Sequence, residues 1–436
     1  MTILLDAPAL EGRFDADAAA LAEFVQRGAA LLEGLALDAR RELRDAVDAA
    51  RERFLRAHVE RLYDELSDGC TRALRAEALL ERAAERVPGL VPTAADVAAE
   101  RQHRQADKVG VEIAQALLLS HVLANPRTGA HLVWAMLRPT EEALARLEAF
   151  RRAGELDLGQ AHVRRDGAAG VLELRNPRHL NAEDDSTLPP TEVAVDLLLL
   201  DPDVEVAIFR GGVVDHPRYA GRRIFGSGIN LTHLYNGRIS LVGFFLVRDL
   251  GYVNKLYRGL SAREHRPGEP EDTTEKPWIA AAETYAIGGA CQLLHVIDHV
   301  LAERGCRMYL PARKEGIIPG ASPLRLGRSV GDRLARQAIL SGREFVAGTA
   351  DGALLCDEVV EPGEMDAALA RRLEALTSSG VVSVAANRRS LRVGEEPLDV
   401  FRAYMATYAR DQAYCHYSPA LIRNLEQHWD ARNRQL

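Results

Sequence analysis

Apolar residues recur at helical intervals along the first third of the chain. Between residues 41 and 66 they stand three to five positions apart: Leu43, Val47, Ala50, Phe54, Val59, Leu62 and Leu66. Ala, Leu, Arg and Glu dominate here, and Thr93, followed three positions later by an acidic residue, is expected to cap one helix. The pattern predicts an all-helical N-terminal domain over residues 1–155. Its role is either packing and oligomerisation or covering an active site built later in the chain.

Beyond residue 155, short apolar runs alternate with helical spacing. Strand character is expected at 162–176 as a hairpin, from Val204, from Pro277, at 307–311 and at 356–360. Helices are expected at 193–200, 231–260 and 330–340, with a polar loop over 261–275. Strands that alternate with helices predict an α/β domain over residues 156–365 with mostly parallel pairing. Residues 366–436 are again helical, with aromatic residues suited to covering the core or to an oligomer interface.

One stretch, residues 276–299, organises the rest of the chain. Pro277 opens a small, apolar strand, and Ile287-Gly288-Gly289-Ala290 forms a turn. From Cys291 onward the spacing predicts a helix with Leu294, Ile297 and Leu301 on one side. The free N–H groups and positive dipole end of such a helix suit a phosphate or an oxyanion formed during a reaction.

Composition narrows the class of protein. The formal net charge of −8 gives no reason to expect nucleic-acid binding. The five cysteines lack C-x-x-C spacing, which indicates neither a disulfide framework nor a zinc site. The first residues do not resemble a secretory signal and no apolar run reaches membrane-spanning length, so we expect a cytoplasmic protein. His295 and His299, four apart on the expected helix, leave a metal site as an alternative, but no third ligand is evident.

Six segments, in order and at consistent spacing, resemble the crotonase (enoyl-CoA hydratase/isomerase) superfamily. They are RNPRHLNAED, DPDVEVAIFRGG, FGSGIN, KPWIAAAETYAIGGACQL, EGIIPGASPLRLGRSVG and AILSGREFVAGTADGALLCDEVV. The resemblance implies an α/β fold of crotonase type, a ββα spiral, here with an N-terminal all-helical domain and C-terminal helices. It also implies acyl-CoA substrates and trimers or hexamers of identical chains.

The resemblance assigns roles to particular residues. The backbone N–H groups of Ile229 and Gly289 would hold the thioester oxygen while an enolate forms, and such donors bind developing negative charge strongly. Residues in the regions that hold coenzyme A in this family are Arg178, His179, Arg222, Arg223 and Ile224. Arginine is a suitable phosphate clamp.

Two departures from the family pattern bear on the reaction. Hydratases of the superfamily carry two glutamates that manage water, and their positions are occupied here by Gln292 and Ala312. Glutamine is no general base and alanine offers no polar group. Addition of water to a double bond is therefore expected to be disabled, while the enolate-stabilising part of the site remains.

An enolate-forming site without these glutamates is similar to a cofactor-independent dioxygenase subgroup of the superfamily. That resemblance implies conversion of 3,5-dihydroxyphenylacetyl-CoA and dioxygen to 3,5-dihydroxyphenylglyoxylate and CoA, in dihydroxyphenylglycine and glycopeptide antibiotic biosynthesis, without a metal, flavin or haem. Glu183, Arg248 and Gln292 would meet the ring hydroxyls, with Glu183 alternatively assisting proton removal. Ile318 would line a dry pocket. An enoyl-CoA hydratase or isomerase and a non-catalytic acyl-CoA-binding protein are the alternatives.

Overall fold

The computed structural model describes residues 7–32, 34–265, 272–378 and 382–434. Contacts group the chain into two units. The helical unit comprises Met1–Met136, Thr232–Val247 and Leu398–Leu436, and the sheet unit comprises Leu137–Leu231 and Arg248–Pro397. This grouping differs from the predicted segments of 1–155, 156–365 and 366–436, because a middle segment and the end of the chain join the N-terminal helices. In the described part of the chain no helix is long and apolar enough to cross a membrane.

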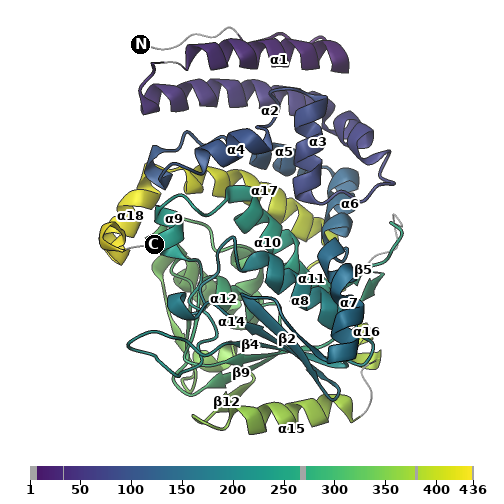
Figure 1. The fold of residues 1–436 in the computed structure, drawn as a ribbon, viewed down its shortest axis with the longest axis vertical. Coiled ribbons are helices and arrows are strands. Elements are labelled where there is room, and N and C mark those ends of the chain that lie inside the picture. The colour runs from purple at the N-terminus through teal and green to yellow at the C-terminus, as the bar shows by residue number, and fades with distance from the viewer. Residues whose placement is uncertain (1–6, 33, 266–271, 379–381, 435–436) are drawn as a thin grey trace. The chain divides into compact units, whose positions relative to one another are not determined.

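The helical unit is built around α5 (Glu112–Ala124), whose residues are almost all buried. The antiparallel pair α1 (Phe14–Leu31) and α2 (Leu37–Ser67) lies side by side in Figure 1, and α17 (Leu398–His416) packs along α5. The other elements of the unit are α3 (Ala76–Arg86), α4 (Ala94–Glu100), α6 (Pro126–Met136), α9 (Leu231–Tyr235), a π-helix (Leu241–Leu246) and α18 (Pro419–Trp429). The predicted cap is confirmed, since Thr93 and Asp96 form a capping box at the start of α4.

Several aromatic residues of the C-terminal helices are used inside the helical unit. Phe401, Tyr408 and Tyr417 are buried, and the Tyr417 hydroxyl donates to the Glu112 carboxylate at 3.0 Å. These side chains therefore stabilise the unit's own core. Tyr414 of the same helices is 47% exposed, and the oligomer interface that the aromatic enrichment suggested stays a prediction.

The sheet unit contains a seven-stranded sheet in the order β1-β2-β3-β4-β7-β9-β12. The strands span Glu155–Asp157 (β1), Ala161–Asp166 (β2), Ala169–Leu174 (β3), Val206–Gly211 (β4), Trp278–Ala282 (β7), His299–Glu303 (β9) and Glu358–Val360 (β12). The predicted hairpin is confirmed, since β1, β2 and β3 pair antiparallel and the remaining neighbours pair parallel. In register, Phe209 lies opposite Ala280, and Ala280 lies opposite Val300.

Helices cover both faces of this sheet. On one face α15 (Met365–Thr377) packs Met365 and Leu369 against the core that Ile279 and Ala281 of β7 share with neighbouring strands. Figure 1 shows α15 along that face. On the other face α8 (Leu188–Leu200) contacts β2 and β3, and a Cβ at Gly170 would lie 2.5 Å from Leu198. Burial on both faces explains why β7 is uniformly small and apolar.

Smaller elements complete the sheet unit. A second sheet has the order β11 (Phe345–Val346), β10 (Arg307–Tyr309), β8 (Tyr285–Ile287), and a third pairs β5 (Leu260–Ser261) with β6 (Thr273–Thr274). The remaining helices are α7 (Glu141–Ala153), α12 (Gly289–Leu293), α13 (Ala312–Glu315), α14 (Ser322–Ser341) and α16 (Val382–Glu395).

Two predicted elements are wrong. The helix expected from Cys291 through Leu301 ends at Leu293, and His299–Glu303 is strand β9. Leu301 pairs with Ala281 and belongs to the sheet core, because a short apolar run satisfies strand and helix patterns equally well. The helix expected over 231–260 is divided into α9, the π-helix, α10 (Val247–Leu250) and α11 (Tyr252–Arg258). Part of the predicted loop 261–275 forms β5 and β6, and residues 266–271 of it lie outside the described residues.

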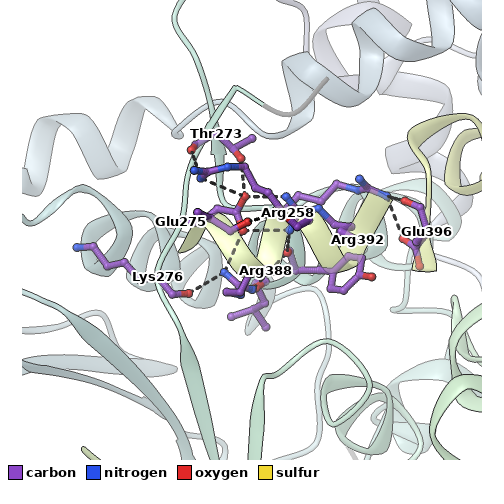
Figure 2. Close-up of polar contacts among 12 residues, drawn as sticks. Arg258, Thr273, Glu275, Lys276, Arg388, Arg392 and Glu396 are labelled. Carbon is purple, nitrogen blue, oxygen red and sulfur yellow. Dashed lines mark hydrogen bonds and ion pairs between the residues drawn. The ribbon is translucent and has the colours of Figure 1, made fainter. Parts of the chain in front are cut away.

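Helix α16 turns charged residues inward. Arg388 and Arg392 are buried, and Figure 2 shows both reaching from this helix toward Glu275. Arg388 also donates to the carbonyls of Lys276 and Leu256, both at most 2.8 Å away. The helix therefore joins the end of α11 to the residues that precede β7.

Candidate functional site

Two glycine turns of the sheet unit lie against each other. The N–H of Gly226 donates to Tyr285 O at 3.2 Å, and the N–H of Ile287 donates to Gly226 O at 3.0 Å. Gly228 has φ +84°, and a Cβ there would lie 2.9 Å from Ile287 O and 3.4 Å from Gly289 N. Only glycine permits both this conformation and this close approach. The turn at Gly226–Gly228 therefore lies directly beside the turn at Gly288-Gly289.

The two predicted oxyanion donors lie on these turns. Ile229 follows Gly228. The N–H of Glu183 donates to Gly228 O at 2.7 Å, and the N–H of Asn230 donates to Glu183 O at 2.8 Å. These two hydrogen bonds fix the backbone on either side of Ile229. Gly289 begins α12, where an N–H has no carbonyl partner within the helix. Within the described ranges, the N–H groups of Ile229 and Gly289 donate to no acceptor. Both are available to a ligand oxygen.

Arg248 of α10 holds the polar side of the site together. Its Nε and Nη2 donate to the two carboxylate oxygens of Glu183 at 2.9 and 2.8 Å. Its Nη1 donates to Gln292 Oε1 at 2.9 Å, and Nη2 also donates to the carbonyl of Gly289 at 2.9 Å. The structure therefore brings together Glu183, Arg248, Gln292 and Gly289, all of which the sequence proposed for the site.

Tyr252 is a member of this cluster that the sequence did not indicate. Its hydroxyl donates to Glu183 Oε1, and its ring lies 5.4 Å from the Arg248 guanidinium carbon. It stands four positions after Arg248, a helical spacing that could have identified it, although Gly251 separates α10 from α11. Tyr252 therefore gives a second donor to Glu183 Oε1, the oxygen that also accepts from Arg248 Nε.

Burial controls the electrostatics of this cluster. Glu183, Arg248 and Tyr252 are each at most 3% exposed. Burial alone would lower the pKa of Arg248, but the nearby Glu183 carboxylate outweighs it, and the pKa of the guanidinium lies above its ordinary value. Burial also raises the pKa of the Tyr252 phenol well above its ordinary value. The cluster thus presents a permanent cation and a neutral phenol to the site.

The Gly288-Gly289 turn and the polar cluster lie directly against each other. A Cβ at Gly289 would lie 2.4 Å from Glu183 Oε2 and 3.1 Å from Arg248 Nη2. A side chain at position 289 would therefore displace the ion pair. The turn and the ion pair therefore constrain each other's position.

Ile318 lies in the loop that connects α13 to α14 and is half-buried. Gly320 of that loop has φ +46°, and a Cβ there would lie 2.4 Å from Gln292 Oε1. The loop that carries Ile318 is thus packed against the Gln292 amide. Ala312, at the position where the family's hydratases have a glutamate, is buried and brings no polar group to this side.

The residues predicted to hold coenzyme A lie in two segments outside this cluster. Arg178 and Arg222 are exposed and His179 is half-buried, so their side chains can reach a ligand. Arg222 lies 3.4 Å from Glu303, and Arg223 is engaged with Glu173 at 2.5 Å. Ile224 has no exposed area, and its carbonyl accepts from the Asn181 side chain at 2.8 Å. Ile224 is therefore a packing residue.

The alternative of a metal site at His295 and His299 loses its geometric basis. The two residues do not share a helix, since α12 ends at Leu293 and His299 begins β9. Among the described residues no group of three or more His, Cys, Asp or Glu side chains is arranged to hold a metal ion.

Comparison with known proteins identifies relatives of the chain. The family model described as enoyl-CoA hydratase/isomerase matches residues 271–404. A (3,5-dihydroxyphenyl)acetyl-CoA 1,2-dioxygenase from Amycolatopsis orientalis is 47% identical over 427 residues, which cover 96% of this chain and 97% of that protein. A short-chain-enoyl-CoA hydratase from Clostridium acetobutylicum is 26% identical over 241 residues, 55% of this chain and 83% of that protein.

A solved structure supports the fold class. The crystal structure of an enoyl-CoA hydratase from Mycobacterium avium subsp. paratuberculosis K-10 matches with a TM-score of 0.51 and 19% identity, over 62% of this chain and 98% of that chain. This likeness and the family match confirm the predicted α/β fold of crotonase type with additional helices. The match to the dioxygenase from Amycolatopsis orientalis, which covers almost the full length of both chains, identifies the family within that superfamily. The chain belongs to the (3,5-dihydroxyphenyl)acetyl-CoA 1,2-dioxygenase family, within the enoyl-CoA hydratase/isomerase superfamily.

Proposed function

We propose that this protein oxidises (3,5-dihydroxyphenyl)acetyl-CoA with dioxygen to 3,5-dihydroxyphenylglyoxylate and CoA. The observation that carries the proposal is the contact between Gly289 and the Arg248–Glu183 pair, where a Cβ would lie 2.4 Å from Glu183 Oε2. An oxyanion-type turn thus lies beside a buried polar cluster suited to a phenol. The relative from Amycolatopsis orientalis, 47% identical, carries the name of this activity.

The first step is removal of a proton from the α-carbon of the thioester. The N–H groups of Ile229 and Gly289 bind the thioester oxygen, and they bind it more strongly as it becomes an enolate oxygen. One such donor is worth about 10²–10³ in rate. The aryl ring beside the α-carbon spreads the negative charge further.

The oxidation balances without another redox partner. The α-carbon changes from a CH₂ group to a ketone, and its electrons reduce dioxygen. Both oxygen atoms of dioxygen end in the product, as new carbon–oxygen bonds form and the oxygen–oxygen and carbon–sulfur bonds break. The two hydrogens of the CH₂ group leave on the carboxylic acid and on the CoA thiol. The balance needs no further oxidant or reductant, and we propose that no metal, flavin or haem takes part.

Arg248, Glu183 and Gln292 are proposed to bind the two ring hydroxyls. Glu183 accepts hydrogen bonds from Arg248 and Tyr252, so both oxygens of its carboxylate are already engaged within the cluster. This favours hydroxyl binding over proton removal for Glu183. Ile318 is proposed to keep the α-carbon side of the pocket dry, because water would return a proton to the enolate.

The remaining proposals concern the setting of the reaction. Arg178, His179, Arg222 and Arg223 are proposed to hold the phosphates of CoA, with the Arg223 guanidinium shared with Glu173. A cytoplasmic homo-oligomer, a trimer or hexamer, acting in dihydroxyphenylglycine and glycopeptide antibiotic biosynthesis is the proposed context.

Dioxygen uptake by the chelator-treated protein tests the function. We expect uptake of one dioxygen per molecule of (3,5-dihydroxyphenyl)acetyl-CoA, with equimolar free CoA and the keto acid as products. Hydration of an enoyl-CoA without uptake would instead favour the hydratase or isomerase alternative, which the replacement of both glutamates already disfavours. Tight binding of either thioester without turnover would favour a non-catalytic acyl-CoA-binding protein.

A further inference from the structure

Asp249 is a buried carboxyl group that the proposed reaction leaves unused. It is the residue after Arg248 and is 2% exposed. Its Oδ1 lies 3.9 Å from Arg248 Nη1, and this one oxygen has no hydrogen-bond partner among the described residues. Burying a polar oxygen without a hydrogen bond costs free energy, so the contacts around this oxygen call for an explanation.

The Asp249 carboxyl converges with Gln292 on one point of the loop that carries Ile318. A Cβ built on Gly320 would lie 2.8 and 3.0 Å from the two Asp249 oxygens and 2.4 Å from Gln292 Oε1. The backbone N–H of Ala321, the next residue, donates to the Asp249 carboxyl. Asp249 therefore holds this loop at the place where the loop packs against Gln292.

Charges around Asp249 act in opposite directions. Burial raises the pKa of its carboxyl, whereas Arg248 and Arg325 favour the ionised form, and burial prevails. The N–H of Ala321 donates to this carboxyl, and the side-chain oxygen of an asparagine, which has the same shape, could accept the same hydrogen bond.

We propose that Asp249 is a positioning residue, which holds the Ile318 loop against Gln292 and so decides whether the enolate meets dioxygen or is reprotonated. This inference rests on the proposed function, in which Ile318 keeps the pocket dry. Asp249 acts through the backbone of Gly320 and Ala321 and touches no reacting atom.

The test compares two measurements on the same substrate. Exchange of the α-hydrogens of (3,5-dihydroxyphenyl)acetyl-CoA for deuterium, without dioxygen, reports enolate formation. Dioxygen uptake in air reports oxidation. For Asp249→Ala we expect the ratio of exchange to uptake to rise by about tenfold or more, because a displaced loop admits water. For Asp249→Asn, which keeps the acceptor and the shape, we expect a ratio within about threefold of the wild type.

Asp201→Asn is the matched control. Asp201 is also fully buried in the sheet unit, and its carboxylate accepts from Arg165 at 2.7 Å. This variant is expected to lower the thermal transition and to leave the ratio unchanged. If Asp249→Ala gives no cooperative transition, Asp249→Leu replaces it, since leucine fills the volume without an acceptor.

The outcomes separate the inference from the proposed function. A wild-type ratio in Asp249→Ala, or an equally raised ratio in Asp249→Asn, would overturn the positioning role. A wild-type protein that takes up no dioxygen with this substrate would overturn the proposed function itself, whatever the variants do.

Discussion

The Arg248 guanidinium meets the Glu183 carboxylate at two points, through Nε at 2.9 Å and Nη2 at 2.8 Å. Both groups are almost completely buried. The planar fork of arginine fits this geometry, while the single ammonium of lysine does not. The pair therefore fixes the direction in which the remaining Arg248 nitrogen, Nη1, presents itself to Gln292.

Replacing Arg248 by lysine is expected to lower kcat/KM by about a hundredfold or more, because one point charge replaces two aligned hydrogen bonds. The Arg248→Ala variant leaves Glu183 buried without its cation and is expected to lose about 3–5 kcal/mol of unfolding free energy as well. Steady-state dioxygen uptake and urea unfolding measure the two effects. Unchanged kcat/KM in both variants would remove Arg248 from the site.

Alanine at Gly289 is expected to abolish uptake, since its Cβ would lie 2.4 Å from Glu183 Oε2. Gly394 in α16 is the control glycine, because nothing lies within 4 Å of a Cβ there. Gly394→Ala is expected to leave kcat/KM unchanged and to stabilise the fold by about 0.5–1 kcal/mol. Near-normal uptake by Gly289→Ala would contradict the contact between the turn and the ion pair.

Gln292→Glu is expected to slow uptake by about tenfold without producing a hydratase. A carboxylate there would lie beside the forming enolate and would also compete with Glu183 for Arg248. Ala312, buried at the other family position, offers no second carboxylate. Dioxygen uptake checks the expected loss of rate, and hydration of crotonyl-CoA by the same sample checks for hydratase activity. A measurable hydration rate would show that one glutamate is enough for the addition of water.

Stability in acid is expected to depend on Glu396. Its carboxylate accepts hydrogen bonds from Nε and Nη2 of Arg325, each at 2.9 Å. Burial opposes ionisation of this group, but Arg325, Arg258 and Arg328 together lower the pKa of Glu396 to about 2. A carboxyl whose pKa is depressed on folding stabilises the protein above its unfolded pKa, near 4.5. That stabilisation, about 3 kcal/mol, is lost as the pH falls from about 4.5 to about 2.

The Glu396→Gln variant isolates this contribution. It is expected to be several kcal/mol less stable than the wild type at neutral pH, since it leaves buried arginines without their carboxylate. The difference in unfolding free energy should shrink as the pH falls through the range just given. A difference that stays constant with pH would mean that Glu396 is not ionised in the folded protein.

Much of the site could be predicted because short motifs carry it. Gly289 and Gln292 stand in one turn, and Glu183 and Arg248 occupy positions that the family resemblance marks. The sequence did not indicate Tyr252 and Asp249, because their roles depend on contacts with Glu183 and Ala321, which are distant in the chain. Such pairings leave no periodic signal.

The fold was predictable to a similar extent. The hairpin and the mostly parallel sheet follow from apolar runs and turns, and the helices of the first 136 residues follow from their spacing. Strand β9 was mistaken for helix, since five residues are too few to distinguish the two periods. The π-helix over Leu241–Leu246 was also missed, because an apolar run of that length reads as an ordinary helix.

The pairing of α5 with α17 has a consequence for synthesis on the ribosome. Helix α5 ends at Ala124, whereas α17 begins only at Leu398, so the buried surface of α5 emerges long before the helix that covers it. At ordinary translation rates the delay is roughly ten seconds to a minute. During that interval the face of α5 that packs on α17 has no covering helix, although α2 and α6 are already made, and the helical unit can complete its core only at the end of synthesis.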